Sequence, residues 1–314
     1  MHAQCLSEIE GAEIVACCDR EESRAVQFKS EFSLSYATAD VTQIFSDDTI
    51  RTVYICTHHD SHLPLALAAC ESGKDIFMEK PLALTIKECE TIANAVERSG
   101  VKFFMGFKMR FYPMIARARA FLPSPKMISA QMMDVRWSDD FWANDPRKGG
   151  GNVLSEGVHT FDLLTYLASA NPVRVFAEGK NFHHPRFEMM GNKMIDGLVA
   201  TVTFDNGTVA SVTQGDLGHP ALVSKLSFQM FDGMKSVHLY NRLKSYILYD
   251  GVKSETFNDI EETGYIEENR AWIHSLQTGI PSPCTAIDGW RATMIVQKAF
   301  TAARTNQPQK LEKL

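Results

Sequence analysis

The first third of the chain alternates short apolar runs with amphipathic segments. This pattern predicts four strands at residues 13–18, 51–57, 75–78 and 102–107, and three helices at residues 21–32, 61–72 and 85–99. Thr85 with Glu88 three residues later forms a capping box, which marks the start of the third helix. Strands that alternate with helices are typical of a parallel sheet covered on both faces. We therefore expect an α/β fold, with a doubly wound parallel sheet over residues 1–107.

Residues 108–314 instead show the period-two alternation of strands. The predicted strands lie at residues 127–137, 173–179, 197–204, 208–214, 225–231, 235–240 and 245–249, and two helices follow at 266–278 and 288–305. Glycine follows Asn206, Asp232 and Asp250 at turns between these strands. We expect an α+β domain with a large, mainly antiparallel open sheet, whose last helices can pack back on the first domain. Helices can cover only one face of this sheet, so the other is expected to make a homo-oligomer contact.

Composition narrows the class of protein. The chain has 314 residues and a formal net charge of −6, from 32 basic and 38 acidic residues, which argues against a nucleic-acid partner. It has no apolar stretch of membrane-spanning length. The seven cysteines form no C-x-x-C pair and fall mostly inside apolar runs, as expected of buried thiols in a reducing compartment. These features predict a soluble, cytoplasmic protein without a membrane partner.

Several polar residues stand where predicted parallel strands end, at the edge that opens the ligand crevice of such a sheet. Glu79-Lys80-Pro81 ends one strand, where partial burial can tune an ammonium for proton chemistry; a plain surface lysine is the alternative. Asp19 closes the first predicted strand, where a carboxylate can accept hydrogen bonds from ribose hydroxyls or cap the next helix. Arg20 beside it could instead bind a 2′-phosphate.

Histidines suggest two further kinds of chemistry. His58, His59 and His62 come without carboxylate or cysteine ligands, so no metal is expected there. His159 and Asp162 are three residues apart in a helical pattern, which puts both on one face. An imidazole is suited to taking a hydroxyl proton, although a purely structural histidine is the alternative.

Three segments in order, E-K-P from Glu79, G-F-K-M-R-F-Y-P from Gly106 and G-G-G-N-V-L-S-E-G-V-H-T-F-D from Gly149, resemble the Gfo/Idh/MocA family of NAD(P)-dependent sugar, polyol and cyclitol oxidoreductases. The resemblance runs over nearly the whole chain. It implies a Rossmann-like first domain, NAD as cofactor with NADP as the alternative, a sugar or cyclitol substrate, and a dimer or tetramer.

The resemblance also implies roles for individual residues. Lys80 would polarise the substrate oxygen and His159 would act as the general base. The family commonly has an aspartate where this chain has Ser155, so either Asp162 assists His159 instead or the proton chemistry is divided differently between His159 and Lys80. The candidate cofactor contacts are Asp19, Arg20, Thr57, His58, His62, Glu79, Lys80 and Lys108, and the candidate substrate contacts are Lys80, Arg110, Trp142, Ser155 and His159.

One part of the family pattern is not found. The first strand and its G-x-G-x-x-G turn do not precede the predicted strand at residues 13–18, and His2-Ala3 matches the pair that commonly follows the turn. The strands at 13–18 and 51–57 should then leave a gap, pair directly or accept a strand from elsewhere. A start inside a longer protein, a natural short variant and completion by another chain all fit this pattern.

Two other functions use the same fold. A regulatory protein would need only ligand binding, whereas a glycoside hydrolase with transient NAD oxidation would need Lys80 and His159, as the dehydrogenase does. The presence of both residues favours an enzyme.

Overall fold

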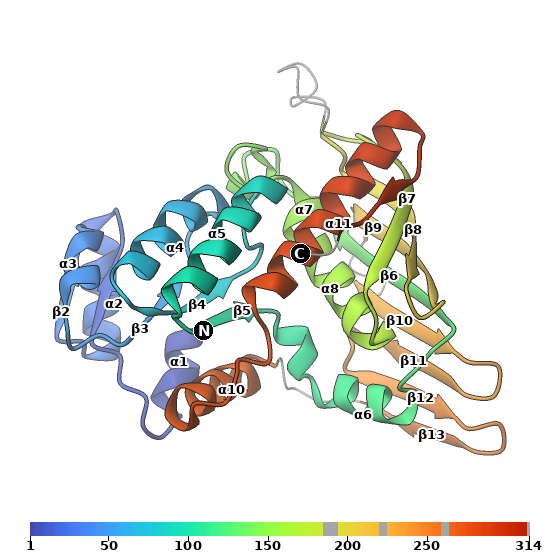
Figure 1. Ribbon diagram of the computed structural model, residues 1–314, viewed down its shortest axis with the longest axis horizontal. Helices are drawn as coiled ribbons and strands as arrows, with labels where there is room; N and C mark the ends of the chain where they lie inside the picture. The colour runs from blue at the N-terminus through green and yellow to red at the C-terminus, as the bar shows by residue number, and fades with distance from the viewer. Residues whose placement is uncertain (185–193, 220–224, 259–263, 313–314) are drawn as a thin grey trace.

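The computed structural model describes residues 1–184, 194–219, 225–258 and 264–312. An α/β part formed by the first third of the chain lies beside a large sheet, and helices stand between the two (Figure 1). Both expected architectures, the parallel sheet and the mainly antiparallel one, are confirmed.

The first part follows the predicted alternation. Its elements are α1 (His2–Ser7), β1 (Ala16–Cys18), α2 (Glu22–Phe32), β2 (Tyr36–Thr38), α3 (Val41–Ser46), β3 (Thr52–Ile55), α4 (His62–Glu71), β4 (Asp75–Glu79), α5 (Ile86–Ser99) and β5 (Phe103–Gly106). Strand β4 is central in the parallel sheet β3-β4-β5, and its Ile76, Phe77 and Met78 are fully buried. The predicted capping box of Thr85 and Glu88 starts α5.

The parallel strands of this part form two separate sheets. Strand β1 pairs with β2, and β3 pairs with β4 and β5. No strand of the described residues joins β1 to β3. Of the three arrangements expected from the sequence, the structure therefore shows the gap.

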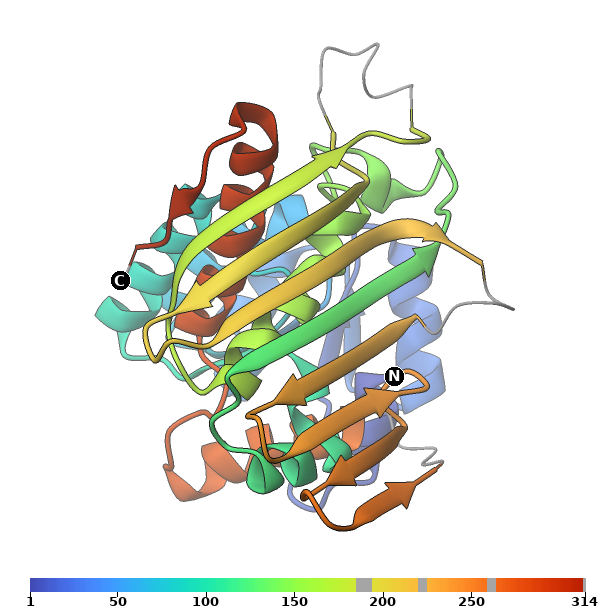
Figure 2. The ribbon, with the colours of Figure 1, turned by 90° about the vertical axis from the view of Figure 1, so that its right-hand side faces the viewer.

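The second part is built on a nine-stranded sheet in the order β13-β12-β11-β10-β6-β9-β8-β7-β14 (Figure 2). Only β6 and β9 pair in parallel; the other neighbours are antiparallel. The strands are β6 (Met127–Val135), β7 (Pro172–Lys180), β8 (Gly197–Phe204), β9 (Val209–Gly218), β10 (Leu226–Phe231), β11 (Ser236–Tyr240), β12 (Ser245–Tyr249), β13 (Ser254–Phe257) and β14 (Gln309–Lys310).

Helices cover one face of this sheet, and no helix of the described residues covers the other (Figures 1 and 2). The covering helices are α6 (Pro113–Phe121), α7 (Asn152–Ser155), α8 (Gly157–Ala168) and α11 (Ala286–Thr305). Strand β8 shows the alternation, since Ala200 and Val202 are buried whereas Val199 is 54% exposed. Helix α11 also packs on α5, and α10 (Tyr265–Thr278) packs on α1.

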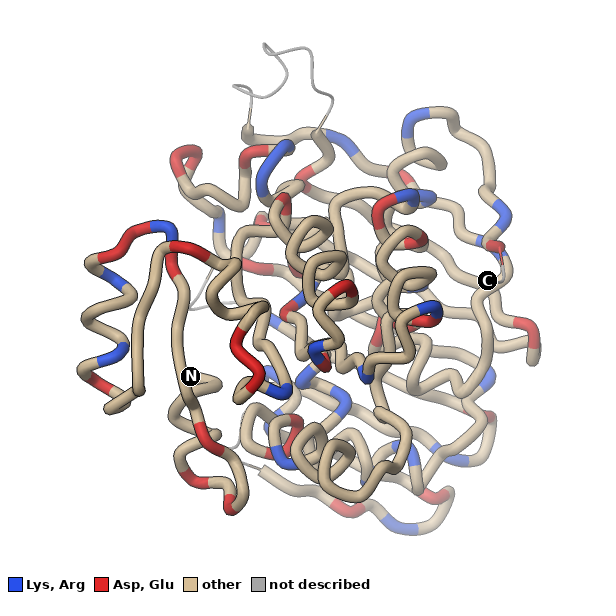
Figure 3. Tube along the Cα trace, turned by 60° about the vertical axis from the view of Figure 1, so that its left-hand side comes forward, with Lys and Arg blue, Asp and Glu red and all other residues tan. Residues whose placement is uncertain are grey.

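Short elements were missed by the sequence pattern. Strands β2, β13 and β14 and helix α3 have at most six residues, too few to show a period. Strand β13 is also exposed along its whole length, so no apolar face marks it. Over the described residues, no helix is both long and apolar enough to cross a membrane. Acidic and basic residues are interspersed on the side drawn in Figure 3.

Candidate active site

The carboxyl end of β4 meets the segment that joins α7 to α8. Lys80 follows β4, and its Nζ donates to the backbone oxygen of Ser155 at 3.0 Å and to Oε1 of Glu156 at 2.9 Å. These two hydrogen bonds join Lys80 to residues that lie 75 and 76 positions later in the chain. Ser155, expected to contact the substrate, is buried and meets Lys80 through its carbonyl.

The glycine triplet explains why the chain folds into this position. A Cβ at Gly149 would lie 2.2 Å from the Cα of Ala143, so only glycine allows the two backbones to approach. Gly151 has a φ of +83° immediately before α7, a conformation that side chains disfavour. The triplet thus turns the chain sharply and brings the start of α7 and α8 against Lys80.

Glu156 is the residue that the sequence reasoning missed. Its carboxylate pairs with Lys80, and its Oε2 lies 3.6 Å from Nζ of Lys225. Although burial opposes ionisation, these two ammonium groups hold the pKa of Glu156 well below its usual range. A signal was available: a carboxylate stands next to Ser155, one position from where the family commonly has its aspartate.

His159 lies on α8 with 4% of its surface exposed. Its Nδ1 is buried and has no hydrogen-bond partner among the described residues. Burial and the positive charge of Lys80 lower the pKa of His159 to about 3, while Glu156 raises it. The imidazole is therefore neutral near pH 7 and has a nitrogen lone pair to receive a proton.

Asp162 and Arg110 have partners different from those expected. Nε of Arg110 donates to Oδ2 of Asp162 at 2.8 Å, and its second guanidinium nitrogen contacts both Asp162 and, at 3.0 Å, Asp288. Both Arg110 and Asp162 are buried. Asp162 was expected to assist His159, and Arg110 to contact the substrate. The structure instead places both in an ion pair that joins α8 to the start of α11, because the guanidinium fork fits the carboxylate.

Glu79 ends β4 next to Lys80, and Lys108 follows β5. Nε2 of His2 lies 3.0 Å from Oε1 of Glu79, whose other oxygen accepts the backbone N–H of Lys80. Although burial opposes ionisation, the His2 hydrogen bond and Lys80 lower the pKa of Glu79 to about 2. Nζ of Lys108 stands 3.8 Å over the ring centre of Tyr265, and burial lowers the pKa of Lys108.

The remaining cofactor candidates lie at the ends of β1 and β3. Asp19 is half-buried and accepts the backbone N–H of Glu21 at 2.8 Å. Glu21, not Asp19, is the N-cap of α2, and α2 has no side-chain cap. Arg20 is exposed beside it. Thr57 is exposed after β3, and its hydroxyl accepts from Ser61 at 2.6 Å.

The three neighbouring histidines have different roles. The ring of His58 stacks on Trp142 with centres 4.0 Å apart, which ties the loop before the glycine triplet to the end of β3. Nδ1 of His59 faces the oxygen of Gly149 at 2.9 Å. His62, expected to contact the cofactor, is fully buried, and its nitrogens face the carbonyls of Pro81 and Thr57 at 2.7 and 3.2 Å. His62 therefore holds the ends of β3 and β4 together and has no ring nitrogen left for a cofactor.

The residues present fit two parts of NAD. Asp19 suits the adenosine ribose, and Glu79 with Lys80 suits the nicotinamide end. The pyrophosphate of a dinucleotide is normally held by a glycine turn and a helix N-terminus that follow a strand between the equivalents of β1 and β3. Within the described ranges no strand occupies that place. The described residues therefore fit the adenosine and nicotinamide ends of the cofactor and do not include the usual pyrophosphate-binding turn.

Buried neutral histidines predict that acid destabilises the fold. The pKa of His159 and of His59 is about 3, in each case chiefly because of burial, whereas an unfolded histidine titrates near 6.5. Between these values the unfolded chain binds protons that the folded chain does not, so stability falls as the pH falls below about 6.5. Two such groups should cost about 4 kcal/mol between pH 7 and pH 5.

Urea unfolding at pH 7 and pH 5 measures this loss. His159→Gln should lose about 2 kcal/mol of the pH dependence, because one of the contributing groups is removed. The exposed His274 provides the control, since His274→Gln should keep the full dependence. Glu79 and Glu156, whose pKa values are lowered, add their own loss only below about pH 4.5. An unchanged slope in His159→Gln would contradict the assignment of a neutral buried ring.

Comparison with known proteins bears on both halves of this site. A family model described as an oxidoreductase family with an NAD-binding Rossmann fold, GFO_IDH_MocA, matches residues 1–107. A second model, for the GFO/IDH/MocA C-terminal domain, matches residues 122–222. Lys80 lies in the first matched region, and Glu156 and His159 lie in the second.

Individual relatives match over almost the whole chain. The uncharacterized oxidoreductase YrbE of Bacillus subtilis is 25% identical over 320 residues, 99% of this chain and 93% of its own. Myo-inositol 2-dehydrogenase of Thermotoga maritima is 22% identical over 335 residues, 100% of this chain and 96% of its own. A levoglucosan dehydrogenase solved with NADH and L-sorbose has the same fold, with a TM-score of 0.89, 18% identity, and coverage of 100% of this chain and 95% of the other.

Proposed function

Because the chain belongs to the Gfo/Idh/MocA oxidoreductase family, we propose that it transfers hydride between NAD and a secondary hydroxyl or ketone of a sugar, polyol or cyclitol. The observation that carries this proposal is the group formed by Lys80, Glu156 and His159 at the carboxyl end of β4, in which His159 is buried and the side chains of Lys80 and Glu156 are 15% and 16% exposed. A protein that only bound a ligand would not need an ammonium, a carboxylate and a neutral imidazole held together out of water. The relative named for myo-inositol and the neighbour named for levoglucosan support a cyclic polyol as substrate.

The residues divide the reaction between them. NAD, when bound, supplies the hydride acceptor. In this proposal the Lys80 ammonium donates a hydrogen bond to the substrate oxygen and stabilises the negative charge that grows there as the proton leaves. The neutral ring of His159 takes that proton, so the alcohol loses one hydride and one proton and becomes a ketone.

Glu156 supports both groups. It fixes the Lys80 ammonium at 2.9 Å, and its charge raises the pKa of His159 toward the value needed to accept a proton. We therefore assign to Glu156 the assisting role that the sequence had suggested for Asp162. Ser155 contributes its backbone carbonyl to the same ammonium.

NADH formation with a panel of cyclitols and cyclic sugars tests the proposal. We expect absorbance growth with at least one secondary alcohol, and a fall of roughly 10²-fold or more for Lys80→Met, which removes a buried charge-stabilising donor. Lys87→Met, at an exposed position of α5, is the matched control and should keep the wild-type rate. Tight sugar and NADH binding without turnover would favour a regulatory protein, and release of a free sugar from a glycoside would favour the hydrolase.

We also propose a homo-oligomer formed through the uncovered face of the large sheet. That face carries exposed apolar side chains on three strands, including Met127, Val199 and Val209 at 61%, 54% and 41% exposure. Light scattering at micromolar concentration should show a dimer or tetramer, and Val199→Lys should weaken it. Val252→Lys, at an 84% exposed turn position, is the control. A monomeric wild type would contradict the proposal.

A cytoplasmic location is proposed on the cysteines. All seven are free thiols, and Cys70, Cys89 and Cys284 are buried. Thiols in this state are typical of a reducing compartment.

A further inference from the structure

A cluster of histidines and aspartates lies at one end of the large sheet, outside the site described above. His183 and His184 follow β7, Asp196 immediately precedes β8, and Asp216 lies in β9. His184, Asp196 and Asp216 are fully buried. Together, His183, His184 and Asp196 offer one ligand atom each within 4.8 Å of one another.

The two imidazoles converge on one carboxylate. Nε2 of His183 lies 3.2 Å from Oδ1 of Asp216, and Nε2 of His184 lies 3.2 Å from Oδ2. The first contact is not a hydrogen bond: both atoms are buried and have no hydrogen-bond partner among the described residues. Two ligands bound tetrahedrally at about 2.0–2.2 Å from a metal ion are roughly 3.3 Å apart, which matches both separations.

The surroundings resemble the outer shell of a metal site. Nδ1 of His184 lies 2.8 Å from the carboxylate of Asp139, the arrangement that fixes a metal-binding imidazole with its other nitrogen toward the ion. Asp196 accepts the backbone N–H groups of Phe182 and His183 at 2.8 and 2.9 Å, which holds the loop that carries both histidines. The backbone N–H of Trp137 donates to Asp216 at 3.0 Å.

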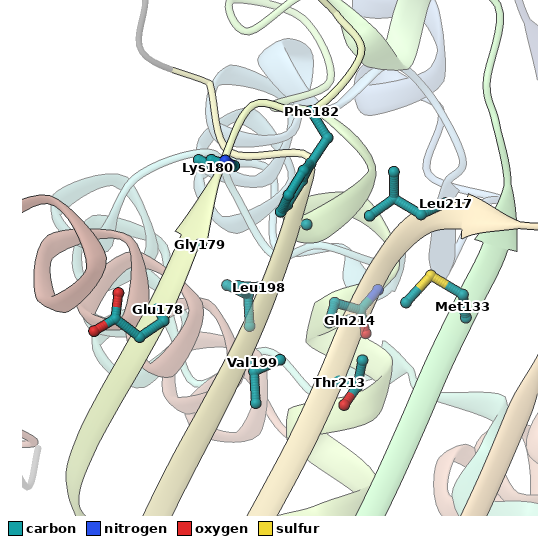
Figure 4. Close-up of a pocket in the computed structure, with 11 residues that line it drawn as sticks. Met133, Glu178, Gly179, Lys180, Phe182, Leu198, Val199, Thr213, Gln214 and Leu217 are labelled. Carbon is teal, nitrogen blue, oxygen red and sulfur yellow. The ribbon is translucent and has the colours of Figure 1, made fainter.

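The alternation of β9 shows where the cluster faces. Leu217 lines a pocket with Phe182 and Val199 at this end of the sheet (Figure 4). Neighbours in a strand point to opposite faces, so Asp216 points to the helix-covered face, in agreement with its complete burial. The carboxylates of Asp196 and Asp216 are thus removed from water, a costly state unless a cation compensates their charge.

We propose that His183, His184, Asp196 and Asp216 bind a divalent first-row transition-metal ion such as zinc. Two imidazoles with carboxylates are the donor set that such ions favour. The ion is structural: it ties the loop after β6, through Trp137 and Asp139, to the ends of β7, β8 and β9. It also supports the active site indirectly, since Nε1 of Trp137 and Nζ of Lys225 both donate to Asp134, and Lys225 faces Glu156.

Metal analysis of untagged protein tests this assignment without reference to catalysis. We expect about one zinc per chain after incubation with zinc and removal of unbound ion, and a melting temperature that rises with zinc and falls with a chelator. His183→Ala and Asp216→Asn should abolish the zinc response. His274→Ala removes an exposed histidine instead and should keep it.

Cobalt(II) titration of the wild type provides a readout that does not depend on the folding of any variant. Binding by imidazole and carboxylate should produce a saturable visible absorption band at one equivalent, and zinc should displace it. A wild type that retains no stoichiometric zinc and shows no cobalt band would overturn the proposal. The proposal would also be overturned if NMR showed the rings of His183 and His184 to be protonated on both nitrogens at pH 7, because two imidazolium ions would then compensate the charge of Asp216 without a metal.

Discussion

Replacing His159 with glutamine is expected to lower kcat by roughly 10²–10⁴-fold, the range typical of a lost general base. The NADH dissociation constant should stay nearly unchanged. His159 lies on α8 and is 4% exposed, and its neutral ring offers a nitrogen without a protein hydrogen-bond partner among the described residues. Glutamine keeps the polarity and much of the volume but cannot take a proton.

Steady-state kinetics and NADH titration by intrinsic fluorescence separate the two effects. His274→Gln is the control for removal of a histidine far from the crevice. A kcat within about twofold of the wild type, or a loss confined to NADH affinity, would show that His159 is a structural residue.

The second large effect is expected in NAD affinity, when a β-strand and a G-x-G-x-x-G turn are added ahead of Met1. In the 314-residue chain, β1 and β3 belong to separate sheets, and the N-terminus of α1 at His2 has no side-chain cap. The added strand can pair with both, and the turn places backbone N–H groups at that helix N-terminus, where pyrophosphate binds. NADH should bind at least tenfold more tightly, about 1.4 kcal/mol, and the melting temperature should rise.

Calorimetric titration of both proteins measures the difference. An extension with the same strand but with its three glycines replaced by valine is the matched control. It should raise the melting temperature through strand pairing and leave NADH affinity low, because the phosphate-binding turn is lost. If the 314-residue protein already binds NADH as tightly as the extended one, the turn is not needed and this interpretation is wrong.

Long-period patterns in the sequence were sufficient for the architecture. The strand–helix alternation before Phe107 and the period-two runs after Met127 each extend over many residues. The apolar positions of each buried face therefore recur many times in the sequence. Short or exposed segments such as β2 and β13 carry no such signal, because they have three and four residues and no alternating buried face.

The candidate active site was predictable only in part. Lys80 could be placed at a strand end, and the glycine triplet could be recognised as a turn that leads into the helix with His159. The partners of these groups could not, since they depend on contacts between residues that lie far apart in the chain. Arg110 takes the carboxylate of Asp162, and Glu156 takes the ammonium of Lys80. The histidine–aspartate cluster could not be predicted from the sequence, because its members lie at four strand ends between Asp139 and Asp216 and show no metal-ligand spacing.

Deuterium transfer tests the central claim most directly. A cyclic polyol labelled with deuterium at the carbinol carbon is incubated with NAD and the protein, and the NADH formed is examined by mass spectrometry. The account predicts one deuterium carried directly into NADH by the wild type, with transfer slowed by roughly 10²-fold or more in both Lys80→Met and His159→Gln. Label that appears in water instead, or transfer at the wild-type rate in both variants, would contradict it.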